Sequence, residues 1–223
     1  LIPRYNISTT SVSWHNYRLK PSLAENYDLY FSVHDNHIGL FTVGSFVKRI
    51  RDLIYPVKKV ILDPAEYELG NETKDLEIHT SINNPHRADI WGIELDWQTN
   101  FWYLPGFLRG LVFNANYTHI FSRAKYPRTE IEVEYVFYPK FEIKKQYIYS
   151  YYSDRLLNQP DNIVNAAIGY DFKGFSVRLS MLYQSDIFKA TNFWPELRSV
   201  TDDYLRWDLS VKQSLPWYGL QIY

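Results

Sequence analysis

The sequence predicts an all-β protein whose antiparallel strands form part of a transmembrane β-barrel with long extracellular loops. Three observations lead to this prediction. Several segments alternate between apolar and polar residues at a period of two, as strands do when their two faces meet different environments. Very short turns alternate with long links along the chain. Aromatic residues stand at both ends of apolar strand faces, as they do at the two interfaces of a membrane barrel.

Six segments show the alternation clearly, and none carries Asp, Glu, Lys or Arg on its apolar face. They are 26–34, 90–98, 111–121, 164–172, 175–184 and 205–212. A seventh strand is expected at 38–50, where the two faces are less distinct. Together these segments indicate roughly 7 to 10 strands, which we expect to be part of a larger barrel.

The connections differ greatly in length. Tight turns are expected at 35–37 and 173–174, where Asp, Asn and Gly suit a hairpin. Long links cover 53–89, 122–163 and 185–203. Short turns on one side and long loops on the other are typical of an outer-membrane barrel, with the turns in the periplasm and the loops outside.

Two shorter features lie between the strands. A turn containing Leu104, Pro105 and Gly106 separates the strands at 90–98 and 111–121. Inside the second long link, alternation returns at 131–137 and a tyrosine-rich run follows at 147–152. We expect these two runs to form a hairpin that projects above the membrane, with Pro139 near its tip.

The aromatic residues of the apolar faces predict the membrane interfaces. Trp91 and Trp97 bracket two aliphatic residues, and Phe175 and Tyr183 bracket three. At about 3.3 Å per residue and a tilt of about 40°, the segment 175–183 covers about 20 Å vertically, close to an outer-membrane apolar band. The predicted girdle consists of Tyr27, Trp91, Trp97, Tyr170, Phe175, Tyr183 and Trp207.

Aromatic residues in the loops predict a ligand-binding surface, since aromatic side chains offer a large contact area at low entropy cost. The candidates are Tyr147, Tyr149, Tyr151, Tyr152, Phe193 and Trp194. An equally simple interpretation is that this hairpin packs against neighbouring loops. Both interpretations stay open on the sequence alone.

Composition excludes several classes of function. The chain has no cysteine, which removes disulfides, thiolate metal sites and cysteine nucleophiles. A net charge of −1 argues against a nucleic-acid surface. The pairs His34/His37 and His79/His86 have no third ligand at a convincing spacing. No nucleophile elbow or phosphate loop is present, so neither an enzyme, a metal site nor a cofactor is predicted.

Seven stretches, taken in order, resemble the C-terminal part of a TonB-dependent outer-membrane receptor. They are 19–27 (LKPSLAENY), 44–54 (GSFVKRIRDLI), 83–95, 104–106 (LPG), 114–118 (NANYT), 159–180 and 204–210 (YLRWDLS). The chain departs from the family at Ser22, where Glu is usual, and it lacks the glycine usual after Tyr27.

The resemblance implies energy-dependent uptake of a scarce nutrient across the outer membrane of a Gram-negative bacterium. An iron–siderophore, haem, cobalamin or a glycan are all substrates of the family. The implied partners are outer-membrane lipid, the rest of the barrel and its plug, the TonB complex, and a small-molecule or glycan substrate. No nucleic acid is implied.

Residues 1–223 are expected to be part of one such barrel domain. Nothing in them resembles the TonB box or the plug domain. Counting back by twos from Tyr223 gives Gln221 and Gly219, which suit the wrong face for a closing strand, so the closing strand is also expected outside this chain.

Two alternatives remain from the residues themselves. One is a passive porin-like barrel without a plug. The other is a soluble β-sandwich that binds glycans through its loop aromatics, because a sandwich shows the same alternation of apolar and polar residues.

Overall fold

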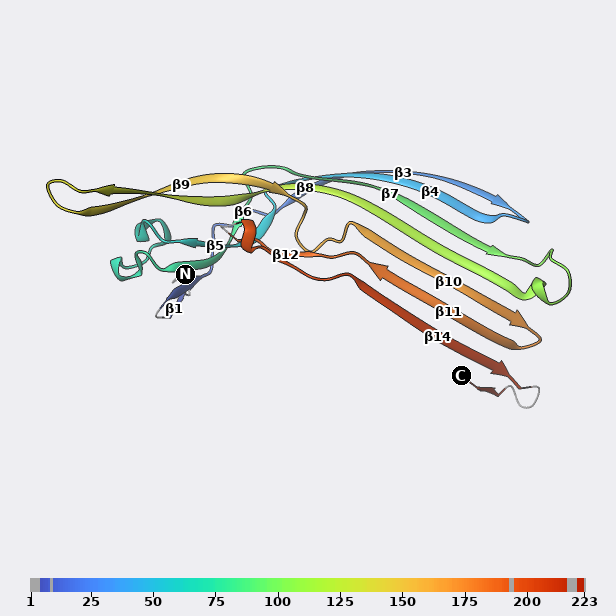
Figure 1. Ribbon diagram of the computed structural model, residues 1–223. Coiled ribbons are helices and arrows are strands. Elements are labelled where there is room, and N and C mark those ends of the chain that lie inside the picture. The colour runs from blue at the N-terminus through green and yellow to red at the C-terminus, as the bar shows by residue number, and fades with distance from the viewer. Residues whose placement is uncertain (1–4, 9, 193–194, 216–219, 223) are drawn as a thin grey trace.

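The computed structural model describes residues 5–8, 10–192, 195–215 and 220–222, and its largest element is a nine-stranded antiparallel sheet (Figure 1). Its main path runs β15-β14-β11-β10-β8-β7-β4-β3, and β9 pairs with the far half of β8. The strands are β3 (Leu23–Asp35), β4 (Gly39–Arg51), β7 (Ala88–Asn100), β8 (Leu111–Val136), β9 (Glu142–Asp154), β10 (Asn162–Phe172), β11 (Phe175–Gln184), β14 (Tyr204–Ser214) and β15 (Gln221–Ile222).

Six of the seven predicted strands lie within a strand of this sheet, and the seventh, 38–50, begins one residue before β4. The predicted segment 175–184 matches β11 at both ends. The alternation was a sufficient signal because each of these strands has one apolar and one polar face. The predicted hairpin at 131–137 and 147–152 is also present, as β8 and β9. Its first strand is not separate, because β8 runs without interruption for 26 residues.

Tight turns and long links lie at opposite ends of the sheet (Figure 1). We call these the turn end and the loop end. The two predicted hairpin turns, after β3 and after β10, are confirmed. Lys173 and Gly174 both have positive φ, of 48° and 82°, as a tight hairpin turn requires. The predicted turn containing Leu104, Pro105 and Gly106 does separate β7 from β8, and Gly106 also begins a 3-10 helix, η3 (Gly106–Gly110).

The long links contain regular structure that the sequence did not predict. The residues before β3 and the first long link together form a four-stranded sheet of order β1-β2-β6-β5, in which β2 and β6 are parallel. The elements at the loop end outside the large sheet are β1 (Tyr5–Ile7), β2 (Ser11–Trp14), β5 (Ile54–Val60), η1 (Pro64–Tyr67), η2 (Asn71–Thr73), β6 (Glu77–Asn83), β12 (Phe188–Ala190), η4 (Pro195–Leu197) and β13 (Ser199–Val200). We call the described residues of 5–22, 53–87, 123–161 and 185–203 the cap.

The buried hydrophobic residues cluster at the loop end. One cluster lies in the small sheet, around Val12, Ile61 and Ile78, and the other joins Tyr126 to Phe188 and their neighbours. By contrast, the apolar face of the large sheet is open, with Leu29 74% and Leu209 69% exposed. In a β-sandwich that face would be the buried core, so this arrangement opposes the soluble sandwich.

Candidate functional site

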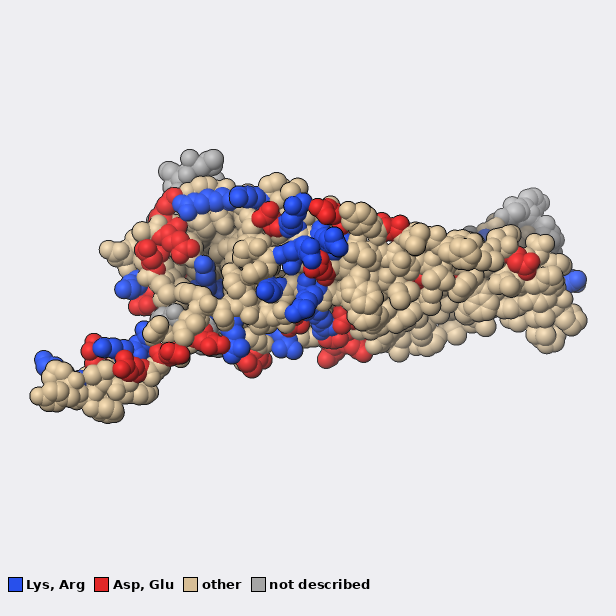
Figure 2. All heavy atoms as spheres, turned by 90° about the horizontal axis from the view of Figure 1, so that it is seen from above, with Lys and Arg blue, Asp and Glu red and all other residues tan. Residues whose placement is uncertain are grey.

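The apolar faces of the strands form one continuous surface. Strand register places Tyr27 opposite Val47, Val47 opposite Trp91 and Trp91 opposite Phe121. The rings of Trp91 and Phe121 stack with centroids 3.9 Å apart. Figure 2 shows that Lys, Arg, Asp and Glu are sparse over the turn-end half of the molecule and frequent over the loop-end half.

The remaining predicted girdle residues lie on the same face. Trp97 and Trp207 belong to one row of the sheet, which runs through Ala115, Ala166 and Met181. The others are Tyr170, opposite Val177, Phe175, opposite Phe172, and Tyr183, opposite Val164. The structure thus brings all seven together on one apolar face, and their place at a membrane interface stays a prediction.

The opposite face of the sheet is polar and holds its large side chains flat. Tyr30 lies over Gly44, directly opposite it, and its hydroxyl donates to Glu94 Oε2 at 2.9 Å. A Cβ on Gly44 would lie 2.4 Å from the Tyr30 ring. Glycine at this position therefore leaves the space through which Tyr30 reaches across β4 to β7.

Two further glycines on this face have the same role. Phe46 covers Gly92, and Arg178 covers Gly169, each from the directly opposite position of a neighbouring strand. Arg178 is fixed by Asp171, which accepts from both guanidinium nitrogens at 2.9 and 2.6 Å. Large side chains are therefore laid along the wall and leave the space in front of it free.

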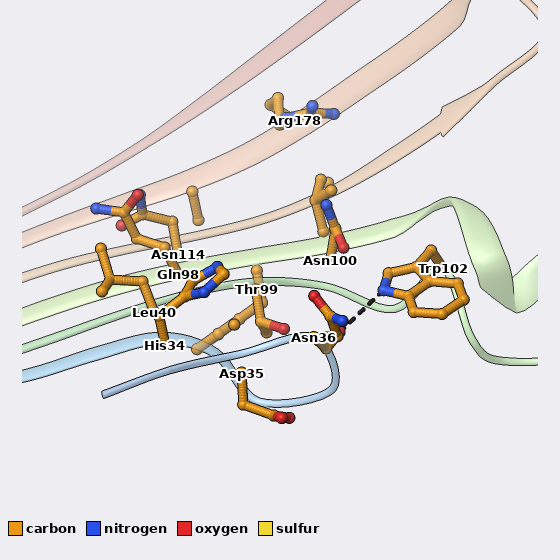
Figure 3. Close-up of a pocket in the computed structure, with 15 residues that line it drawn as sticks. His34, Asp35, Asn36, Leu40, Gln98, Thr99, Asn100, Trp102, Asn114 and Arg178 are labelled. Atoms are coloured by element: carbon orange, nitrogen blue, oxygen red, sulfur yellow. Dashed lines mark hydrogen bonds between the residues drawn. The ribbon is translucent and has the colours of Figure 1, made fainter. Parts of the chain in front are cut away.

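A polar hollow of about 570 Å³ lies on this face near the turn end (Figure 3). Figure 3 shows side chains from several strands around it, with Trp102 at one side donating to the Asn36 carbonyl at 2.9 Å. The labelled lining residues are His34, Asp35, Asn36, Leu40, Gln98, Thr99, Asn100, Trp102, Asn114 and Arg178. Such amide and hydroxyl groups suit water or another polar protein surface.

An aromatic core holds the cap on the large sheet. Tyr126 of β8 meets Tyr55 and Phe188 edge to face, with ring centroids 5.5 Å away in each case. Burial raises the pKa of the Tyr55 and Tyr126 phenols and raises that of Tyr152 to about 12. The three links therefore meet at one packed centre, with every phenol neutral at physiological pH.

Arg155 ties two links of the cap together. Its guanidinium pairs with Asp186 and lies 3.3 Å from Asp161 Oδ2, and it also donates to the Asp186 carbonyl at 3.2 Å. The hydrogen bond to Arg155 lowers the pKa of the Asp186 carboxyl. Sequence reasoning missed this contact, since nothing local marks residues so far apart as partners.

The predicted loop aromatics separate into two environments. Tyr152 points into the core beside Tyr126, whereas Tyr151 is 47% exposed and packs edge to face on His86 at 4.5 Å. Tyr149 is exposed. Tyr147 lies in β9 opposite Ile131, and Phe193 and Trp194 fall outside the described residues. Part of the set therefore packs within the cap, and a binding role stays a prediction.

The cap also contains a hollow that the sequence did not reveal. Its volume is about 440 Å³, and its walls come from β2, β5, β6 and the residues after β12. Trp14, Lys58, His79 and Thr191 are among the side chains that line it. Lys58 and His79 stand directly opposite each other, and both approach Glu77. Aromatic, cationic and hydroxyl groups thus meet in one hollow of the cap.

Two searches of the described residues were negative. None of the helices described is both long enough and apolar enough to cross a membrane. Over the same part of the chain, no group of three or more His, Cys, Asp or Glu could hold a metal ion.

An open antiparallel sheet with one apolar and one polar face, tight turns at one end and a folded cap at the other defines a segment of an outer-membrane β-barrel wall. A family model described as TonB dependent receptor-like, beta-barrel matches residues 2–222. The chain belongs to this family, whose members are transporters of the outer membrane and not enzymes.

Solved structures have the same fold at low sequence identity. The ferric enterobactin receptor PfeA of Pseudomonas aeruginosa, in complex with BCV-L6, matches with a TM-score of 0.52 at 12% identity. That match covers 91% of this chain and 25% of PfeA. The siderophore receptor PirA of Acinetobacter baumannii matches with a TM-score of 0.52 at 15% identity, over 92% of this chain and 27% of PirA. No curated protein is similar enough to count as a match.

The chain therefore spans about a quarter of the receptors whose fold it shares. The prediction of a partial barrel of a TonB-dependent receptor is confirmed by the family and by the fold.

Proposed function

We propose that this chain is part of an outer-membrane receptor that takes up a scarce nutrient by energy-dependent, TonB-linked transport. One observation carries the proposal: residues 2–222 match the barrel family along nearly the whole chain. The arrangement of the structure supports it, since a polar wall with its side chains laid flat leaves room for a plug or a passing ligand. The porin-like alternative has no observation of its own in favour.

The proposed substrate class is an iron–siderophore. PfeA is a ferric enterobactin receptor and PirA a siderophore receptor, and both share the fold of this chain. Haem, cobalamin and glycans are the alternative substrates to be tested. In the proposed receptor, ligand arrives at the cap, whose hollow is lined by Trp14, Lys58 and His79.

The proposed partners lie outside these residues. They are the rest of the same barrel and its plug, the TonB complex, and the surrounding outer-membrane lipid. We propose that residues 1–223 belong to one barrel domain, with the plug and the closing strand contributed by other parts of the full receptor. The two-residue β15 pairs with β14, and β3 has one free edge in the described sheet, where further strands would add.

Uptake by whole cells tests the proposal. Cells that produce the full-length receptor are supplied with labelled ferric siderophores, haem, cobalamin or glycan, with TonB present or deleted. We expect one labelled compound to accumulate only when both the receptor and TonB are present. Accumulation that persists without TonB would instead identify a passive, porin-like barrel.

A further inference from the structure

The apolar face of the large sheet changes character at one row of residues. The row that contains Tyr27, Val47, Trp91 and Phe121 is apolar. The next row toward the loop end, about 7 Å further along the strands, consists of Glu25, Arg49, Asp89 and Arg123. Figure 2 shows Lys and Arg gathered where the charge-poor part of the molecule ends. On one face of the sheet, the last apolar row is therefore followed directly by a row of charged residues.

Arginines engage both carboxylates of this row. Arg51 Nη2 lies 2.8 Å from Glu25 Oε1, and Arg87 Nε lies 2.8 Å from Asp89 Oδ1. Both carboxylates of the row are therefore already paired with an arginine, and they do not balance the charge of the other cations beside them.

Three cations remain at the boundary. Arg49, Arg123 and Lys125 are exposed, and within the part of the chain that the structure describes their side chains form no ion pair. Arg49 and Arg123 stand on either side of Asp89 in one row. We call these three cations, together with the paired Arg51 and Arg87, the basic belt.

We propose that the basic belt binds the phosphate-bearing headgroups of anionic lipids in the outer leaflet of the membrane. The inference rests on the proposed function, because it takes the apolar face as the lipid-facing surface. On that face the aromatic row of Trp91 and Phe121 reaches the end of the apolar band, so the next row lies at headgroup depth. Guanidinium groups bind phosphate with two parallel hydrogen bonds, and clustered Lys and Arg at this depth attract anionic headgroups.

Lipid selectivity of the full-length receptor tests this inference. The receptor is placed in phosphatidylcholine nanodiscs that contain either acyl-brominated phosphatidic acid or acyl-brominated phosphatidylcholine, and tryptophan quenching is compared. Trp91 lies in the row next to the belt. The part of the quenching that disappears in Trp91→Phe therefore reports lipid beside the belt. Each Lys or Arg near a charged surface contributes roughly fivefold to binding. The triple variant R49Q/R123Q/K125Q should therefore lose roughly tenfold or more of the preference for phosphatidic acid.

A matched control removes three other cations. Lys140, Lys144 and Lys145 lie at the far part of the β8–β9 hairpin, so K140Q/K144Q/K145Q should keep the preference of the wild type. An unchanged preference in the belt variant, or an equal loss in both triple variants, would overturn the proposal. Full displacement of phosphatidic acid by inorganic phosphate at the same phosphorus concentration would also overturn the proposal, because it would indicate a site for a soluble anion.

Failure of the lipid proposal is distinguishable from failure of the proposed function. The belt makes no contact with the hollow in the cap, so TonB-linked uptake by R49Q/R123Q/K125Q should stay at the wild-type level. If the wild type shows lipid selectivity but takes up nothing, the transport proposal fails and the lipid site stands.

Discussion

The hydroxyl of Tyr30 on β3 donates to Glu94 on β7 at 2.9 Å, although the whole of β4 lies between these two strands. The contact is possible because Gly44 of β4 presents no side chain at the crossing point. One hydrogen bond therefore joins β3 to β7 across β4 on the polar face, and the bulky ring lies flat on the wall. The same solution recurs where Phe46 covers Gly92.

Removing this hydroxyl should weaken the barrel wall modestly. Tyr30→Phe keeps the ring over Gly44 but loses the hydrogen bond to a carboxylate, which should lower the free energy of unfolding by about 1 to 2 kcal/mol. Tyr27→Phe is the matched control on the opposite face of the same strand and should change stability by less than about 0.5 kcal/mol. Denaturant unfolding of the full-length receptor in detergent measures both, and equal losses would contradict the account.

Removal of the hydroxyl group should affect the stability of the cap differently at two tyrosines of its core. Tyr126 Oη donates to the Arg155 carbonyl and accepts from the Leu157 amide, each at 3.1 Å. Tyr55 Oη is buried and has no hydrogen-bond partner among the described residues. Tyr126→Phe should therefore cost about 1 to 3 kcal/mol, whereas Tyr55→Phe should be neutral or stabilising. Hydrogen exchange of the cap in both variants measures the difference, and a larger loss for Tyr55→Phe would contradict it.

The Arg155 contacts should stabilise the cap in a pH-dependent manner. Arg155→Gln leaves Asp186 and Asp161 without their cation and should cost about 2 kcal/mol near neutral pH, since the site is only partly buried. The pKa of the Asp186 carboxyl is lowered by Arg155 in the folded cap. The stabilisation is therefore complete above the unfolded value of about 3.8 and disappears as the pH falls through the lower, folded value.

Thermal unfolding of the cap, followed near neutral pH and again well below 3.8, tests this dependence. The gap between the wild type and Arg155→Gln should close in acid. Arg18→Gln is the control, because its pair with Glu68 is about half exposed and should contribute little at any pH. A gap for Arg155→Gln that is constant with pH would show that lost packing, and not the ion pair, causes the effect.

The two faces of the large sheet should tolerate charge very differently. Leu179, in the middle of β11, faces the apolar side, and Ser180 beside it faces the polar side. An arginine at mid-depth on a lipid-facing surface costs about 2 to 4 kcal/mol. Leu179→Arg should therefore reduce the folded fraction on a heat-modifiability gel, while Ser180→Arg should leave it close to the wild type. The reverse order would mean that the faces are assigned wrongly.

The strands of the wall could be predicted because each carries its signal locally. β11 was predicted at both ends, since apolar and polar residues alternate along its whole length and a Lys173-Gly174 turn precedes it. Tyr30 breaks the pattern of the polar face in β3. Tyr30 fits on this face because Gly44 lies opposite it. The sequence of a single strand does not reveal its register with a neighbouring strand, so this pairing could not be predicted.

The cap could not be predicted in the same way. β2 pairs in parallel with β6, which lies far along the chain, and β5 contains Pro56, which argues locally against a strand. Arg155 and Asp186 likewise meet only through the fold. The loop aromatics were recognised as a set, but whether a tyrosine points outward or into the core, as Tyr152 does, depends on packing between links.

Accessibility on whole cells tests the central claim most directly, namely that this sheet is a barrel wall in the outer membrane with its cap outside. The chain contains no cysteine, so single cysteines can be placed at Lys140 in the β8–β9 hairpin and at Lys173 in the tight turn after β10. Intact cells that produce the full-length receptor are treated with a membrane-impermeant maleimide. The account predicts that Lys140→Cys is labelled and that Lys173→Cys is labelled only after the outer membrane is permeabilised. Labelling of Lys173→Cys but not Lys140→Cys on intact cells, or of both, would contradict it.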